Sequence, residues 1–134
     1  MSRVLWSAQG ITSATGKRTV ASAGALHPLE LHLLAAHVAG LPPGLYDYDP
    51  VNHALIRCGV EDHRAELAVA AHQQDCVRIA PAVLVIAAVF KRTTQKYGQR
   101  GMRYVHMEAG HVAQNVYLQA AWLNIGTVLV GAFD

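Results

Sequence analysis

The stretch from Met102 to Asn124 constrains the fold more than any other part of the chain. Its apolar residues recur with the roughly 3.6-residue period of an α-helix and form one stripe, namely Val105, Ala109, Val112, Ala113, Val116, Ala120 and Leu123. In its second half, apolar residues also occupy the opposite side, at Tyr117, Leu118, Ala121 and Trp122. A helix that is apolar all round is buried on all sides. We therefore expect a long central helix that also contributes to an interface between subunits.

The composition supports an assembled protein. Only 15% of the residues are charged and 52% are hydrophobic, whereas ordinary soluble domains carry roughly 25% charged residues. We therefore expect part of the apolar surface to face another chain, and the length of 134 residues fits a single domain over 1–134. This composition excludes intrinsic disorder. Because the net charge is only +2 and the basic residues are scattered, no nucleic-acid partner is expected.

Shorter elements surround the long helix. We expect a helix over 1–9, a strand over 30–38, a hairpin with strands over 45–48 and 54–58, a helix over 61–71 and a short strand over 127–130. The apolar run over 82–90 is continuous rather than alternating, which is typical of a central strand covered on both faces. Residues 91–101 are mostly polar and basic, and we expect them to form a loop.

The sequence carries no sign of export or membrane insertion. Cys58 and Cys76 lack CxxC spacing, so they are interpreted as buried small hydrophobic residues in a reducing compartment. The apolar run over 80–90 is far shorter than the roughly 20 residues of a transmembrane helix, and the N-terminus lacks the apolar core of a signal peptide. We expect a cytoplasmic protein with no membrane partner.

Two familiar site motifs are absent. The loop from Gly10 to Lys17 differs from a P-loop because five residues, not four, separate its glycines and Arg18 follows the lysine. No GxGxxG fingerprint of dinucleotide-binding folds occurs.

Glu108 and His111 stand at the i, i+3 spacing of helical metal ligands, but there is no second such pair. We therefore expect no metal, and a role for these two residues at the helix surface or an interface.

Two segments of small residues are candidate ligand-binding loops. The segment Thr19–Pro28 would let a flat ligand approach the backbone closely, and Ser22 within it offers a hydroxyl group. Gly131–Ala132 follows an expected buried strand, where exposed backbone amides can bind a ligand. The alternative is structural: the first segment is then a tight loop packed under the sheet, and the second is only a turn.

Six segments, taken in order, carry a resemblance to a known family: Leu5–Thr12, Ser22–Glu30, Gly40–Tyr46, Tyr97–Tyr104, Glu108–Asn115, and Gly126–Thr127 leading to Val130–Asp134. Together they resemble the nitroreductase-like flavoproteins, and in particular the SagB-type dehydrogenase branch. The resemblance covers most of the chain. It implies an α+β fold with a sheet packed around a long central helix, an intertwined homodimer, and FMN held at the dimer interface.

The resemblance also implies roles for individual residues. The residues that would line the flavin ring or its ribityl chain are Ser22, Ala23, Gly24, Ala25 and Leu26. The backbone amides of Gly131 and Ala132 would point to the N5 and O4 edge, where preorganised donors stabilise the charge of the reduced ring. Arg18 is a candidate to neutralise that charge or the phosphate.

Lys96–Tyr97 looks like the Lys-Tyr pair that azoline-oxidising members carry in the loop before the central helix. In this interpretation the pair is catalytic, because a lysine of lowered pKa removes a proton while hydride passes to flavin N5. The alternative is that Lys96 is a solvated loop lysine.

The chain departs from the family pattern at several places. Members usually begin with an Arg-Ser-x-Arg-type segment that grips the FMN phosphate, and they continue beyond a Gly-Gly-Phe-Asp turn. Here we expect a domain truncated at both ends, with Ala132 for the second glycine, His27 for a tyrosine and Ala21 for a proline. Charge-assisted phosphate contacts are strong. FMN binding should therefore be weaker, unless compensating cations take over: Arg18, Arg100 or Arg103.

The sequence thus predicts an FMN-dependent oxidoreductase of ping-pong type. A reduced donor such as NAD(P)H gives hydride to flavin N5, and a small-molecule acceptor then removes it. The alternative is a truncated, non-catalytic dimerisation or binding module that has lost tight FMN binding. A third possibility is that the chain is a fragment of a longer enzyme.

Overall fold

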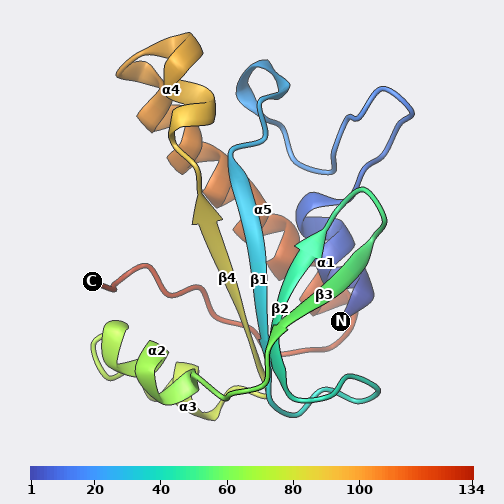
Figure 1. Cartoon of the computed structure of the whole chain (residues 1–134), viewed down its shortest axis with the longest axis vertical. Helices are drawn as coiled ribbons and strands as arrows, with labels where there is room; N and C mark the ends of the chain where they lie inside the picture. The colour runs from blue at the N-terminus through green and yellow to red at the C-terminus, as the bar shows by residue number, and fades with distance from the viewer.

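A four-stranded antiparallel sheet with the order β3-β2-β1-β4 forms the centre of the computed structural model, which describes residues 1–134. In chain order the elements are α1 (Ser2–Gln9), the 3-10 helix η1 (Ala23–Ala25), β1 (Leu29–Ala35), β2 (Gly44–Asp49), β3 (Ala54–Gly59), α2 (Arg64–Ala70), α3 (Asp75–Ile79), β4 (Ala82–Ala88), α4 (Lys91–Tyr97) and α5 (Arg100–Trp122). In Figure 1, α5 and α1 lie behind the sheet, α4 lies beyond one end of it, and α2 and α3 lie near the other. The expected α+β architecture with a long helix is present.

Strand β1 has a clear inside-outside pattern. Leu29 and Leu31 are each 3% exposed, whereas Glu30 and His32 are half-buried. Successive side chains of a strand point to opposite faces, so the two leucines lie on the face that packs against α1 and α5. Burying each leucine contributes about 1.5–3 kcal/mol. A one-residue slip in register would lose both contributions.

Strand β4 lies at the edge of the sheet, so the expectation of a central strand over 82–90 is wrong. It pairs only with β1, from Leu29 opposite Ala88 to Ala35 opposite Ala82. The run is apolar on both faces because both faces have packing partners. Leu84 and Ile86 pack against the main core, whereas Val83 packs against the cluster formed by α2 and α3.

Helix α5 confirms the long helix expected over 102–124. Its buried stripe includes Val105, at 1% exposure, and Val112, at 0%, which pack against α1 and the inner face of β1. On the other side of its second half, Leu118 is 61% exposed and Trp122 is 71% exposed. Within one chain, therefore, only one face of the helix is covered.

One side chain of α5 holds the N-terminal part of the chain in place. The amide nitrogen Nδ2 of Asn115 donates hydrogen bonds to the carbonyl oxygens of Ser7 and Thr19, both at 3.1 Å. Helix α1 ends between them at Gly10, where a Cβ would lie 2.5 Å from the Trp6 carbonyl oxygen. Asn115 therefore fixes both α1 and the loop that leads to the small-residue segment.

Residues 91–97 form helix α4, where the sequence suggested a polar loop. Lysine, arginine and glutamine are good helix formers, but this helix buries only Thr93 and so has no apolar stripe to signal it. Gly98, with a φ of 57°, ends α4. Gly101 then packs so closely that a Cβ on it would lie 2.9 Å from Thr94 Cα. This contact fixes α4 against the start of α5.

The segment after α5 forms no strand, so the expectation of a strand over 127–130 is wrong. None of the four strands pairs with it. It runs back to α2 instead, where the backbone N–H of Asp134 donates to the Ala70 carbonyl oxygen at 3.0 Å. Helix α2 confirms the helix expected over 61–71, although it begins three residues later. Helix α3 was not anticipated.

The cysteines are less buried than expected. Cys58 is exposed and Cys76 is half-buried. Cys58 is exposed because β3 is an edge strand, most of whose side chains reach solvent. Among the helices of the structure, none is both long enough and apolar enough to cross a membrane.

Candidate functional site

The small-residue segment folds into a tight turn immediately before β1. Within it the backbone φ is positive at Gly24 (64°), Ala25 (55°) and His27 (44°). Ser22 Oγ accepts a hydrogen bond from the His27 N–H at 2.9 Å and closes the turn. A left-handed conformation costs a non-glycine residue roughly 1–2 kcal/mol, so the surroundings must hold the turn in place. We call residues 22–27 the flavin turn, after the role that the resemblance implies.

The flavin turn presents backbone and small side chains to the outside. Gly24 and Ala25 are exposed, whereas the neighbouring Ser22, Ala23 and Leu26 are half-buried. A flat ligand can therefore approach the main chain closely on this side.

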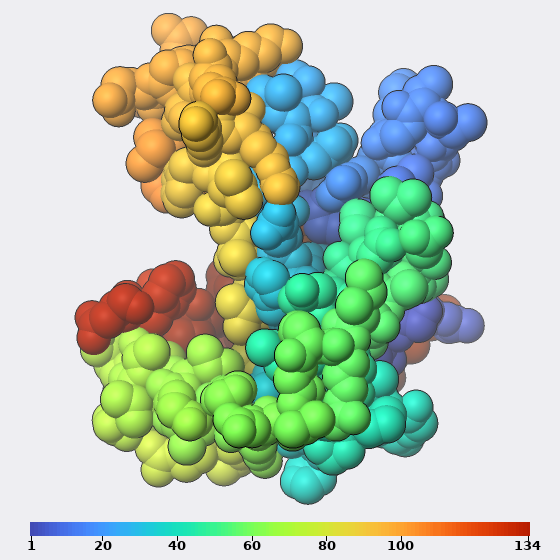
Figure 2. All heavy atoms as spheres, viewed as in Figure 1, coloured from blue at the N-terminus to red at the C-terminus, as the bar shows by residue number.

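The structure brings the Lys-Tyr pair against the flavin turn. A Cβ on Gly24 would lie 2.8 Å from Tyr97 Oη and 3.0 Å from Lys96 Nζ, so the ends of both side chains lie close against this glycine. Lys96 Nζ lies 5.4 Å from the centroid of the Tyr97 ring, and this ring meets Tyr104 edge to face at 5.2 Å. Figure 2 shows α4 beside the segment that precedes β1. Two predicted parts of the site, distant in the sequence, thus touch one another.

The pair stands at the C-terminal end of α4 and not in a loop. Tyr97 is half-buried, whereas the Lys96 side chain is exposed beside it. An amine and a phenol this close together can hold and transfer a proton next to a bound substrate. The helix and the packing on Tyr104 give the pair a fixed support.

Arg18 lies on the inner side of the flavin turn. Its Nη1 donates to Gln9 Oε1 at 2.8 Å, and its Nε is buried without a partner. Burial lowers the pKa of Arg18, while the nearby carboxyl of Glu108 acts in the opposite direction. Arginine nevertheless remains charged at physiological pH. Its positive charge therefore lies behind the turn rather than in open solvent.

Glu108 is the charged residue that sequence reasoning misplaced. It was expected at the helix surface or an interface, but it is only 2% exposed, and its Oε1 has no hydrogen-bond partner. Burial raises the pKa of Glu108, whereas the Ser22 hydroxyl, Arg18 and His111 lower it. The signal was present in the spacing. Glu108 stands three residues after Val105 and four before Val112, within the apolar stripe.

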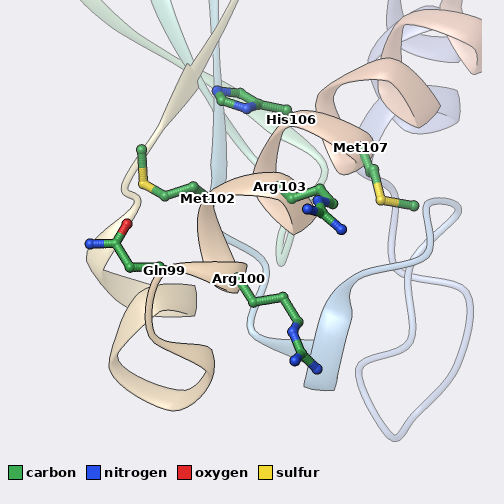
Figure 3. Close-up of a pocket in the computed structure, with 6 residues that line it drawn as sticks. All are labelled: Gln99, Arg100, Met102, Arg103, His106 and Met107. Carbon is green, nitrogen blue, oxygen red and sulfur yellow. The ribbon is translucent and has the colours of Figure 1, made fainter.

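Arg100 and Arg103 line an open hollow of about 810 Å³ at the start of α5, together with Gln99, Met102, His106 and Met107. Figure 3 shows both guanidinium groups extending away from the helix, on the side of Met107. The salt bridges of the molecule engage other arginines, namely Arg64, Arg78 and Arg92. The guanidinium groups of Arg100 and Arg103 are thus free to meet an anionic ligand.

Gly131 and Ala132 lie at the other end of the sheet. Gln74 Nε2 donates to the Ala132 carbonyl oxygen at 3.4 Å, next to α2 and α3, and Figure 2 shows the C-terminal segment beside α2. Helix α3 leads into the start of β4, which pairs with the end of β1, whereas the flavin turn precedes the start of β1. A strand of this length spans on the order of 20 Å. Within one chain, the two predicted flavin-binding segments therefore do not meet.

Comparison with known proteins agrees with this architecture. A model described as the nitroreductase family matches residues 1–134. A nitroreductase-family protein of Methanocaldococcus jannaschii is 52% identical over 133 residues, which make up 99% of this chain and 67% of that protein.

Solved structures share the fold. Crystal structures of nitroreductase-family proteins from Anabaena variabilis and Ralstonia eutropha give TM-scores of 0.80 and 0.82, both at 30% identity. These matches cover 90% and 99% of this chain, but only 26% and 59% of the two larger chains. A chain of the Escherichia coli microcin synthetase McbBCD complex has the same fold, with a TM-score of 0.73 at 23% identity, over 99% of this chain and 53% of that chain. With a family match over its full length and a relative sharing half of its residues, the chain belongs to the nitroreductase family.

Proposed function

We propose that this chain forms part of an FMN-dependent oxidoreductase of the SagB-type branch, working by ping-pong transfer between a reduced donor such as NAD(P)H and a small-molecule acceptor. Members of the nitroreductase family generally use a flavin cofactor. The observation that carries the proposal is the contact of Gly24 with Lys96 and Tyr97. Segments that the resemblance assigns to a single site lie within van der Waals distance of each other.

The residues around the flavin turn fit a flavin. The left-handed Gly24 and Ala25 expose backbone at which a flat ring can stack. The open hollow at the start of α5 carries the guanidinium groups of Arg100 and Arg103, which form no salt bridge and match the charge of a phosphate. Arg18 adds a third positive charge behind the turn. Small residues, exposed backbone and free cations together suit a flat, anionic cofactor.

The roles of the side chains follow from this arrangement. When bound, the flavin supplies hydride exchange at its N5 atom. Ser22, Ala23, Gly24, Ala25 and Leu26 would position the ring or its ribityl chain, with Arg18, Arg100 and Arg103 compensating the negative charge. Lys96 Nζ would accept the proton that a substrate loses as its hydride leaves, and the Tyr97 hydroxyl would hold that proton or the substrate by a hydrogen bond.

We also propose that the functional unit is an intertwined homodimer. Large apolar side chains on the second half of α5 and on the segment after it are at least half exposed in the single chain: Leu118, Trp122, Ile125, Val128, Leu129 and Phe133. An exposed apolar surface of this kind marks an interaction site. Because Gly131 and Ala132 lie far from the flavin turn of their own chain, their amides would reach the flavin held by the turn of the partner copy.

Two glycine substitutions test the flavin turn. Gly24 and Gly16 both have positive φ, but a Cβ meets Tyr97 and Lys96 at Gly24 and nothing within 4 Å at Gly16. We expect Gly24→Val to lower FMN affinity by at least about 10-fold, measured by quenching of flavin fluorescence. Gly16→Val introduces similar backbone strain and should leave the affinity unchanged.

The purified protein supplies the second readout, since a bound flavin gives visible absorption bands. A colourless dimer that does not bind added FMN would refute the oxidoreductase and support a non-catalytic dimerisation module. Equal FMN affinity of the wild type and Gly24→Val would refute the assignment of the turn.

A further inference from the structure

One side chain of α4 reaches across to the flavin turn and to β1. Arg92 Nη1 donates to the His27 carbonyl oxygen at 3.4 Å, and Arg92 Nη2 forms a salt bridge with the Glu30 carboxylate. His27 is the last residue of the flavin turn, and Glu30 is the second residue of β1. No other hydrogen bond joins α4 to residues 22–30. A guanidinium suits this bridge because its N–H donors form a rigid fork.

The other supports of α4 lie at its two ends. Before its start, the Val89 N–H donates to the Pro28 carbonyl oxygen at 2.8 Å. After its end, Gly101 packs against Thr94. The helix itself is short and buries only Thr93. Between these ends, the hydrogen bonds that fix α4 relative to the flavin turn come from Arg92 alone.

The bridge lies on the same side of α4 as the Lys-Tyr pair. Arg92 and Lys96 stand four residues apart and so share one face of the helix. At the far end of this face, Tyr97 Oη and Lys96 Nζ lie 2.8 and 3.0 Å from the position of a Cβ on Gly24. Proton transfer requires groups within hydrogen-bond reach, so a shift of about 1 Å at this contact would be costly.

We propose that Arg92 is a positioning residue: by joining α4 to the His27 carbonyl group and the Glu30 carboxylate, it holds Lys96 and Tyr97 against the flavin turn. Its importance for catalysis rests on the proposed function, because that function places the flavin on this turn. Arg92 acts through the Lys-Tyr pair and contacts neither the flavin nor the substrate.

The direct test measures the contact between α4 and the turn without any cofactor. In the free protein we expect a nuclear Overhauser cross-peak between the Tyr97 ring and the Gly24 Hα protons, because Tyr97 Cε2 lies 3.5 Å from the position of a Cβ on Gly24. Arg92→Met should abolish this cross-peak. Lys91→Met removes the neighbouring exposed cation of the same helix, so it is the matched control and should leave the cross-peak unchanged.

The variants should separate positioning from a general loss of stability. The salt bridge of Arg92 and Glu30 is partly exposed, and such pairs add little to overall stability. We therefore expect Arg92→Met to melt within about 3 °C of the wild type. Arg92→Lys keeps the charge but loses the fork, so it should retain a weakened cross-peak, and Glu30→Gln should weaken the cross-peak as well. A cross-peak of wild-type strength in folded Arg92→Met would overturn the proposal, as would one in Glu30→Gln if Arg92→Met did not fold.

The fluorescence lifetime of bound FMN gives the functional arm. A tyrosine in contact with an excited flavin shortens its lifetime by electron transfer, so Tyr97→Leu should lengthen the lifetime of the bound cofactor. We expect Arg92→Met to lengthen it to a similar extent and Lys91→Met to leave it unchanged. Failure of the wild type to bind FMN would refute the proposed function, whereas the cross-peak would still decide whether Arg92 positions α4. An unchanged lifetime in Arg92→Met despite a lost cross-peak would overturn the role of Arg92 at the cofactor.

Discussion

His27 makes the stability of the flavin turn depend on pH. Burial, and secondarily the positive charge of Arg18, lower the pKa of His27 below its ordinary value of 6.5. The folded state therefore prefers the neutral ring. The neutral His27 ring therefore contributes its full stabilisation above pH 6.5. This stabilisation is lost as the pH falls through the lowered pKa that His27 has in the folded state.

We predict that His27→Asn removes part of this acid sensitivity. Asparagine tolerates the left-handed backbone at this position. Between pH 7.5 and 5, the melting temperature of the variant should fall less than that of the wild type, by about 3 °C. His72 also has a positive φ but is exposed, so His72→Asn is the control and should follow the wild type. Identical pH dependence of the His27 and His72 variants would contradict the prediction.

At the level of residues, the sequence was most informative where a motif is local. The resemblance indicated Gly24, Lys96 and Tyr97, and the structure places them in contact. It could not indicate that the Arg18 side chain turns inward toward Gln9. The burial of Glu108 could have been inferred from its place in the apolar stripe. Its i, i+3 spacing to His111 instead suggested a comparison with metal ligands, which says nothing about burial.

Asn115 connects α5 to the N-terminal part of the chain, and its removal should lower the free energy of unfolding. Asn115→Ala would delete two hydrogen bonds that connect α5 to α1 and to the loop after it. We expect a loss of about 1–3 kcal/mol in the free energy of unfolding, measured by urea denaturation. The neighbouring Gln114 is exposed, so Gln114→Ala should change this free energy by less than about 0.5 kcal/mol. Equal losses in the free energy of unfolding of the two variants would show that the hydrogen bonds of Asn115 do not stabilise the fold.

Element types were predictable where periodicity was strong. The long helix and the hairpin had clear patterns, and both are present. Residues 91–97 lacked an apolar stripe because helix α4 is short and mostly solvated, so a polar sequence resembled a loop. For β4, apolarity reflected packing on both faces, but packing alone cannot say which strand lies next to which. For residues 127–130 the apolar run predicted a buried strand, whereas Val128 and Leu129 are exposed in the single chain.

At the level of the whole molecule, the open face of α5 should control assembly. The double variant Leu118→Lys and Trp122→Lys places two charges on that face. We expect this variant to be a monomer where the wild type is a dimer, as measured by sedimentation velocity. FMN retention should be lost with the dimer. Ile56→Lys is the control, because Ile56 is 57% exposed on the edge strand β3, away from α5. A dimer that persists in the double variant would place the interface elsewhere.

The fold class could be predicted because six segments of the sequence resemble the nitroreductase-like flavoproteins, and the periodicity of the long helix agrees with that fold. The sequence supported the assembly only indirectly, through the scarcity of charge. The relation between Gly24 and Gly131 could not be obtained from the sequence at all. Whether two loops meet depends on the end of the sheet at which each lies, and this follows from strand pairing.

The separation of Gly24 and Gly131 at opposite ends of β1 has a genetic consequence if copies share their sites. Gly24→Val and Gly131→Val would each inactivate both sites of a pure dimer. In a mixed dimer, however, one site would receive both lesions and the other neither. Co-expression of the two defective alleles should thus recover about a quarter of the wild-type flavin content, through intragenic complementation.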